Sequence, residues 1–254
     1  MFSKIGIVGG LGWRSTNDYY AALHELAGSF IDSAVDPQTV LEMGVESLSL
    51  AKARSLLADG ELRDRWEGFD GYHREALRRL EKAGAKVGLI ACNTPHERLL
   101  EIRRGVALEV VDLFEAVADA AQERMVRRLV VLGTPTTMHS PRFRSLLGQR
   151  GIAAVIPEGT AAARLESLIA DLQDGFVPSA PERLLEIVEG SVRAPDPHDL
   201  VGLHCTELPL ALPQFGRHAF FEWRGFNFLN ASIVHVEAAL RAASLSTEGA
   251  AATA

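Results

Sequence analysis

The chain has 254 residues, of which 47% are hydrophobic and 23% are charged. This composition can bury a large core, so it excludes an intrinsically disordered chain and a small disulfide-stapled fold. Acidic residues outnumber basic ones by 33 to 26, and the formal charge of −7 argues against nucleic acid or an anionic membrane as the partner. No apolar run approaches the ~20 residues that cross a bilayer. The N-terminal segment is too short and too rich in glycine for a signal peptide, so we expect a cytoplasmic protein.

Short apolar runs alternate with amphipathic segments along the chain. The segments 72–83 and 184–192 place apolar side chains at the three- to four-residue spacing of helices. Strands rich in Val and Ile that alternate with such helices predict an α/β fold with parallel sheets flanked by helices. In chain order, the predicted strands are Ile5–Val8, Val40–Met43, Val87–Ala91, Leu129–Leu132, Ala153–Ile156, Leu200–Leu203 and Phe226–Leu229.

Two segments repeat one order of features. Residues 87–99 read VGLIACNTPHERL, and residues 201–211 read VGLHCTELPLA. In each, an apolar strand is followed by a cysteine and then by a threonine and a glutamate that would open a helix. A weaker similarity relates GIVGG at 6–10 to VVLGT at 130–134. The repeats indicate two related α/β halves of about 110–120 residues each, near the usual domain size.

Cys92 and Cys205 are the only cysteines of the chain. A structural disulfide is unexpected in a cytosolic protein, and the spacing fits no compact zinc motif, so we predict no metal. In the first motif Thr94 fits an N-cap, with Glu97 closing a capping box. Cys92 would then lie between the carboxyl end of a strand and a helix N-terminus, where α/β sheets bind ligands and where thiolates and carboxylates are favoured. The alternative is that both cysteines are inert, buried strand residues.

Two thiols that face each other between related halves suit proton transfer at a stereocentre. One thiolate would remove a Cα proton from one face, while the opposed thiol delivers a proton to the other. Backbone N–H groups and the side chains of Asn93, Thr94 and Thr206 are candidates for holding the α-carboxylate and stabilising the carbanion. No lysine lies in a recognisable PLP context, so we expect no cofactor.

Several motifs, taken in order, resemble the aspartate/glutamate racemase family. They are GIVGGLGWRSTNDYY at 6–20, ACNTPH at 91–96, LGTPTTM at 132–138, IPEG at 156–159, HCTELPL at 204–210 and VHVEAAL at 234–240. The opening is most similar to the broad-specificity branch. The resemblance implies a cofactor-independent amino-acid racemase with two pseudo-symmetric Rossmann-like domains and an active site in the cleft between them. It places residues 1–112 and 220–254 in one domain and 113–219 in the other. A homodimer is a possible assembly.

By the same resemblance, Cys92 and Cys205 inherit the acid/base roles. Ligand contacts pass to Asn93, Thr94, Thr134, Thr137 and Thr206, and our substrate-binding set adds Gly10, Trp13, Ser47 and Glu207. The glycines before Trp13 read as a tight turn, with Trp13 either walling the pocket or packing on the surface. Glu207 either orients Cys205 or is a carboxylate favoured at a helix start.

The family pattern is incomplete where a side-chain carboxylate would be bound. Aspartate-specific members carry a lysine shortly after the glutamate matched by Glu158, whereas here 159–163 are small residues and Arg164 is the first cation. We therefore predict relaxed side-chain selectivity. The alternatives are a decarboxylase or isomerase of the same superfamily and a non-catalytic amino-acid-binding module. His204 is predicted to be buried, with its hydrogen bonds satisfied.

Overall fold

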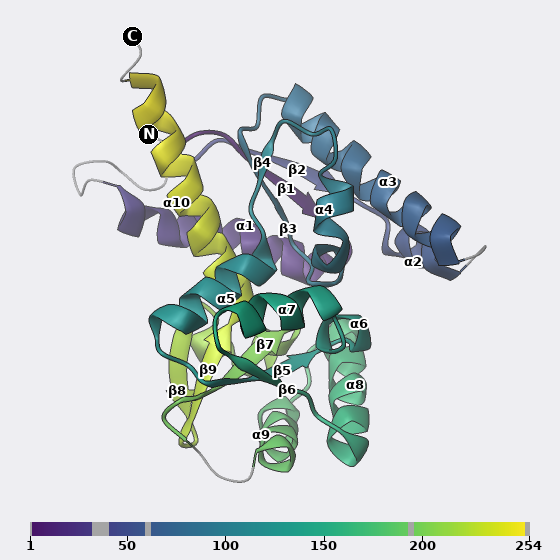
Figure 1. The fold of residues 1–254 in the computed structure, drawn as a ribbon, viewed down its shortest axis with the longest axis vertical. Coiled ribbons are helices and arrows are strands. Elements are labelled where there is room, and N and C mark those ends of the chain that lie inside the picture. The colour runs from purple at the N-terminus through teal and green to yellow at the C-terminus, as the bar shows by residue number, and fades with distance from the viewer. Residues whose placement is uncertain (1, 32–40, 59–61, 193–195, 252–254) are drawn as a thin grey trace. The chain divides into compact units, whose positions relative to one another are not determined.

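The computed structural model describes residues 2–31, 41–58, 62–192 and 196–251 (Figure 1). The chain divides into two compact units, each with its own sheet. Unit 1 contains Met1–Asp112 and His235–Ala254, and unit 2 contains Leu113–Val234. No helix in the described segments is long and apolar enough to cross a membrane.

Unit 1 is built on a four-stranded parallel sheet in the order β2-β1-β3-β4. The central strands β1 and β3 are buried along their whole length, which explains their continuous apolar sequences. The strands are β1 (Ile5–Gly9), β2 (Met43–Ser47), β3 (Val87–Ile90) and β4 (Glu109–Val110). The helices are α1 (Trp13–Ala27), η1 (Gly28–Phe30), α2 (Leu50–Ala58), α3 (Leu62–Lys82), η3 (Thr94–Arg98), α4 (Leu99–Ile102) and α10 (Ala231–Ala251), the last of which starts in unit 2.

Unit 2 holds a five-stranded sheet in the order β6-β5-β7-β9-β8, in which β8 alone runs antiparallel. One continuous apolar core fills this unit, with α5 packed on α7 and α8 on α9 (Figure 1). The strands are β5 (Arg128–Gly133), β6 (Ala153–Val155), β7 (Asp199–His204), β8 (Phe220–Trp223) and β9 (Phe226–Asn230). The helices are α5 (Leu113–Glu123), α6 (Pro135–Met138), α7 (Pro141–Gln149), α8 (Gly159–Asp174), α9 (Ala180–Ser191), η4 (Leu208–Ala211) and η5 (Pro213–Phe215).

Two sequence expectations need correction. The second strand runs over Met43–Ser47, later than the expected 40–43, because Met43 pairs with Ile5 and Ser47 with Gly9. Val40 itself lies outside the described residues, and polar residues are tolerated in β2 because it is an edge strand. The chain returns to unit 1 at His235 and not near 220. Residues 226–230 form β9, which pairs with β7 and thereby belongs to the second sheet.

Candidate functional site

In unit 1, three strand ends bring predicted site residues to one edge of the sheet. The parallel register pairs Gly9 with Ser47 and Val8 with Ile90, so the residues that follow β1, β2 and β3 meet at the carboxyl edge. Gly10 comes directly after β1, Ser47 ends β2, and Cys92 lies two residues beyond β3. This edge is where open α/β sheets bind their ligands.

The turn after β1 can be built only with glycine at position 10. Gly10 has a φ of +83°, and a Cβ atom there would lie 2.2 Å from the Leu48 carbonyl oxygen and 2.6 Å from Ser47 Oγ. Its backbone N–H donates to Thr16 Oγ1 at 2.8 Å. Thr16, which our sequence analysis did not select, therefore fixes the turn from the first helix. Glycine is needed here because the segment after β2 packs directly against the backbone of this turn.

Trp13 begins α1, directly after this turn, and its side chain is 61% exposed. The Arg14 guanidinium lies 4.5 Å from the centre of its ring. The exposure fits a residue at the rim of a site and equally a surface aromatic, so the role of Trp13 as a pocket wall stays a prediction.

Asn93, next to the half-buried Cys92, is the most informative polar residue of unit 1. Its side chain is only 4% exposed, yet neither its amide nitrogen nor its amide oxygen has a hydrogen-bond partner among the residues that the structure describes. Leaving a buried amide unpaired costs on the order of 1–3 kcal/mol, so such groups are rare in native structures and call for an explanation. A polar ligand that pairs with Asn93 would supply it.

The segments after the two cysteines differ from the expected capped helices. Cys92 is followed by the 3₁₀ helix η3, whose N-cap position is taken by Asn93 without a side-chain cap bond, and not by Thr94. Cys205 is followed by the 3₁₀ helix η4, which begins at Leu208. Such short 3₁₀ helices sum few peptide dipoles, so a macrodipole contributes less here than the sequence predicted. An anion bound at either turn would depend mainly on individual N–H groups and side chains.

In unit 2, strand register brings Thr134 and Cys205 to one sheet edge. Gly133 pairs with His204, so the next residue on each of the neighbouring parallel strands β5 and β7 is Thr134 and Cys205. The Thr134 and Thr137 hydroxyl oxygens are 3.3 Å apart, and Thr137 is buried. The predicted hydroxyl donors and the second thiol thus share the carboxyl edge of this sheet.

The second thiol has a carboxylate as its partner. Cys205 Sγ donates to Glu207 Oε2 at 3.0 Å, and the Thr206 hydroxyl donates to the same oxygen at 3.1 Å. All three residues are buried, with 5%, 7% and 5% of Cys205, Thr206 and Glu207 exposed. Of the two roles weighed for Glu207, these contacts support orientation of Cys205. Glu207 also occupies the N-cap position of η4, but its side chain makes no capping hydrogen bond to that helix.

His204 is buried as predicted, but its hydrogen bonds are not satisfied. Neither ring nitrogen has a hydrogen-bond partner in the described part of the chain, and the ring packs edge-on against Phe143 with the centroids 5.0 Å apart. Complete burial lowers the pKa of His204 to about 3, so the ring is neutral. The sequence could not anticipate this, because strand alternation predicts burial and says nothing of partners.

The cations considered for a side-chain carboxylate lie on helix surfaces. Arg164, on α8, pairs with Glu186 at 3.0 Å, and both side chains are more than half exposed. Arg54 is exposed on α2. Asn230, at the end of β9, accepts backbone N–H bonds from Ser232 and Ile233 and thereby caps α10.

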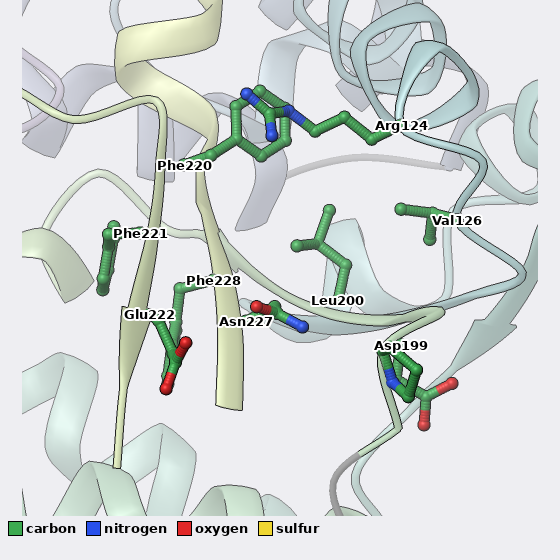
Figure 2. A pocket seen from close by; sticks show the side chains of 10 residues that line it. Arg124, Val126, Asp199, Leu200, Phe220, Phe221, Glu222, Asn227 and Phe228 are labelled. Atoms are coloured by element: carbon green, nitrogen blue, oxygen red, sulfur yellow. The ribbon is translucent and has the colours of Figure 1, made fainter. Parts of the chain in front are cut away.

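A cavity of about 350 Å³ in unit 2 lies at the opposite edge of the sheet (Figure 2). It involves Asp199 and Leu200 at the start of β7 and Asn227 near the start of β9, whereas Cys205 follows the end of β7. Phe220 forms one wall, with the Arg124 guanidinium 3.7 Å from its ring centre (Figure 2). None of the predicted site residues lines this cavity.

Comparison with known proteins agrees with the geometry. Residues 8–239 match the family described as Asp/Glu/Hydantoin racemase. The chain belongs to this family. An aspartate racemase homologue from Pyrococcus horikoshii has 26% identity and a TM-score of 0.72, with 95% of this chain and 99% of that chain covered. The aspartate racemase of Picrophilus torridus has 19% identity and a TM-score of 0.70, with 94% of each chain covered.

A glutamate racemase from Campylobacter jejuni is more distant, at 18% identity and a TM-score of 0.56, with 92% of this chain and 83% of that one covered. Membership of the racemase family makes the protein a cofactor-independent amino-acid racemase, as the motifs predicted. Within the described segments, no group of three or more His, Cys, Asp or Glu side chains is placed to hold a metal ion.

Proposed function

We propose that the protein racemises free α-amino acids by two-base proton transfer, with Cys92 acting on one face of Cα and Cys205 on the other. The unpaired, buried amide of Asn93 beside Cys92 carries the proposal, because it is a polar group prepared for a ligand that the protein does not supply. The Asn93 amide nitrogen and the Thr94 hydroxyl would donate to the α-carboxylate. Thr134, Thr137 and Thr206, which lie at the same sheet edge as Cys205, would also contact the substrate.

The reaction balances with the two thiols alone. The Cys92 thiolate takes the Cα proton, and the electron pair left on Cα is delocalised into the carboxylate held by hydrogen-bond donors. The Cys205 thiol then gives its proton to the opposite face, which inverts the centre and leaves Cys205 as thiolate. The reverse direction begins once solvent has returned a proton to Cys205; Cys205 is then the base and Cys92 the acid. A thiol serves both directions because its pKa can be tuned towards neutrality.

Glu207 acts on Cys205 in this scheme as a positioning residue and as a proton acceptor. The hydrogen bond from Sγ to Oε2 fixes the direction of the S–H bond. When Cys205 serves as the base, its proton can first pass to Glu207. The thiolate then forms beside a neutral carboxylic acid, which avoids two adjacent buried negative charges.

We further propose that side-chain selectivity is relaxed. A second carboxylate in a closed site needs a cation, since an unpaired buried charge costs several kcal/mol. Arg164 is engaged with Glu186 on the surface, and small residues stand at 159–163. Comparing kcat/KM for aspartate, glutamate, homoserine, methionine and alanine tests this. A preference for the acidic substrates above about a hundredfold would contradict it.

The main test is incubation of the protein with single L- and D-amino acids in D₂O, followed by NMR detection of deuterium at Cα. We expect deuterium to enter together with inversion, and Cys92→Ala and Cys205→Ala each to abolish racemisation without loss of the fold. Near-wild-type racemisation by either variant would contradict the two-base scheme. Release of CO₂ instead would indicate a decarboxylase, and binding without exchange would indicate a non-catalytic module.

The setting and assembly follow from the same chemistry. Neither Cys92 nor Cys205 forms a disulfide among the described residues, and a two-thiol mechanism requires both to be reduced, which suits the cytoplasm. Trp13 and Tyr20 are exposed seven residues apart on α1 and offer a surface that a second copy could cover. We therefore propose a homodimer, to be checked by light scattering coupled to size-exclusion chromatography.

A further inference from the structure

A buried polar cluster in unit 1 is left unexplained by the proposed reaction. It joins Tyr19 on α1, His96 on η3, Val111 and Asp112 at the end of the first stretch of unit 1, and His235 where the chain returns to that unit. Tyr19, His96 and His235 are at most 1% exposed. Burying so many polar groups is costly unless they pair with one another.

His96 connects this cluster to the turn that carries Cys92. Its Nε2 lies 3.4 Å from the Ile90 carbonyl oxygen, and the Cys92 backbone N–H donates to that same oxygen at 2.8 Å. A carbonyl oxygen only accepts, so Nε2 carries the hydrogen. The His96 backbone N–H also donates to the Asn93 carbonyl oxygen at 3.0 Å. Both contacts close the loop from Ile90 to His96 around Cys92.

The other side of the His96 ring is held by the rest of the cluster. Its Nδ1 lies 3.7 Å from Asp112 Oδ1, and the His235 ring stands edge-on to it at a centroid distance of 5.1 Å. The ring therefore has one oxygen neighbour at each nitrogen and cannot rotate without losing both. Asp112 lies between β4 and α5 and connects the ring to the chain segment that leaves unit 1.

His235 is itself fixed by two hydrogen bonds. Burial, aided by the neighbouring His96, lowers the pKa of His235 to about 3, so its ring is neutral. Its Nε2 donates to the Val111 carbonyl oxygen at 3.0 Å, which leaves Nδ1 as the acceptor for the Tyr19 hydroxyl at 3.2 Å. The neutral His235 ring is thus held at both nitrogens, and it packs in a fixed orientation against the His96 ring.

We propose that His96 is a positioning residue for Cys92, since the His96 ring and the Cys92 amide share the Ile90 carbonyl oxygen and the ring is locked by Asp112 and His235. The inference rests on the catalytic role proposed for Cys92. Its effect is geometric: the cluster fixes the backbone that presents the thiol. A shift of about 1 Å at a reacting group can cost a hundredfold in rate.

The test compares four substitutions: His96→Leu, His96→Gln, His96→Asn and, as the control, His73→Leu. Glutamine can place a donor near the position of Nε2, whereas asparagine is too short to reach Ile90 and leucine has no donor. His73 is equally buried in the same unit, but its ring bonds to the Phe69 carbonyl oxygen within its own helix. The control therefore reports the general cost of replacing a buried histidine.

The first readout is alkylation of Cys92 by iodoacetamide in the full chain carrying Cys205→Ala, which leaves Cys92 as the one thiol. We expect His96→Leu and His96→Asn to change this rate by at least about threefold, with His96→Gln and His73→Leu within about twofold of the parent. Equal rates for all four variants would overturn the proposal, as would the same change in His73→Leu. If circular dichroism shows that His96→Leu does not fold, the comparison of His96→Asn with His96→Gln decides.

The second readout is racemisation in the chain with both cysteines. We expect His96→Leu to lower kcat at least about tenfold with KM changed less than about threefold, and His96→Gln to recover most of the loss. An unchanged kcat for a folded His96→Leu would overturn the proposal. If the parent racemises no amino acid, the proposed function fails, while alkylation still decides whether His96 positions Cys92.

Discussion

Replacing Glu207 by glutamine should slow the half of the reaction in which Cys205 acts as the base. The substitution keeps the size of the side chain and leaves an amide oxygen that can still accept the Sγ and Thr206 hydrogen bonds, now 3.0 and 3.1 Å to Oε2. What it removes is the ability of Glu207 to take the thiol proton. The thiolate of Cys205 would then have to form by loss of its proton to another acceptor.

The size of the effect follows from the two roles of Glu207. General acid–base groups contribute about 10²–10⁴-fold to rate, and the retained amide contacts preserve the orientation of the thiol. We therefore expect the lower end of that range, about a hundredfold, which is about 2.7 kcal/mol at the transition state. Stability should change little by comparison, because one acceptor replaces another at the same site.

The assay measures the initial rate of Cα deuteration in D₂O from each pure enantiomer at saturating concentration, so that it reports kcat for each direction. We expect the rate to fall about a hundredfold for the enantiomer whose exchange is also lost in Cys205→Ala, and by less than about tenfold for its mirror image. Glu186→Gln, which removes a carboxylate paired with Arg164 on the surface, should leave both rates unchanged. A drop of less than about threefold for both enantiomers would refute a proton-accepting role for Glu207.

Three further predictions concern stability and cofactors. Burial lowers the pKa of His204 and His235 to about 3 and of His73 to about 4, below the unfolded value of 6.5, so the unfolded state binds more protons and stability falls as pH drops from 6.5 towards these values. Each histidine should cost up to about 2 kcal/mol at pH 5, and urea unfolding of His204→Leu should show a shallower pH slope; an unchanged slope would contradict the burial argument. Gly10→Ala should destabilise the fold by more than Gly151→Ala, because both glycines have positive φ but only Gly10 has atoms where the Cβ would go; equal melting temperatures would show that the turn relaxes. Activity should survive EDTA and hydroxylamine, and loss of activity that is restored by a metal would contradict a mechanism based on thiols alone.

Much of the fold could be predicted because it depends on local patterns. Buried parallel strands need continuous apolar runs, and this placed β1, β3, β5 and β7 to within a residue or two at each end. Two edge strands, β4 and β8, escaped prediction. β4 has only two residues, and β8 carries Glu222 between aromatic residues. The boundary near 220 failed for the same reason, since which sheet receives β9 is set by pairing across the unit and not by its own sequence.

The site was predictable in its residue types and not in its pairings. The repeat of strand, cysteine and threonine led us to propose both thiols and their polar neighbours as site residues. The sequence could not show that Glu207 rather than a helix terminus contacts Cys205, or that Asn93 takes the N-cap position in place of Thr94. It gave equally little indication that His96 and His235 meet, because they are brought together only when the chain re-enters unit 1. Long-range contacts of this kind carry no local signal.

The two thiols occupy chemically different settings despite the repeat that relates them. Cys205 is buried and donates to a carboxylate, whereas Cys92 is half-buried beside an amide that lacks a partner. Because the two enantiomers of a substrate have equal free energy, the ratio of kcat/KM for the two directions must equal one, whatever the sites look like. The asymmetry can therefore appear only in kcat and KM separately. The direction with the lower kcat must also have the lower KM. Substitution of Glu207 should lower kcat more in the direction that uses Cys205 as the base. Substitution of His96 should lower kcat more in the direction that uses Cys92 as the base.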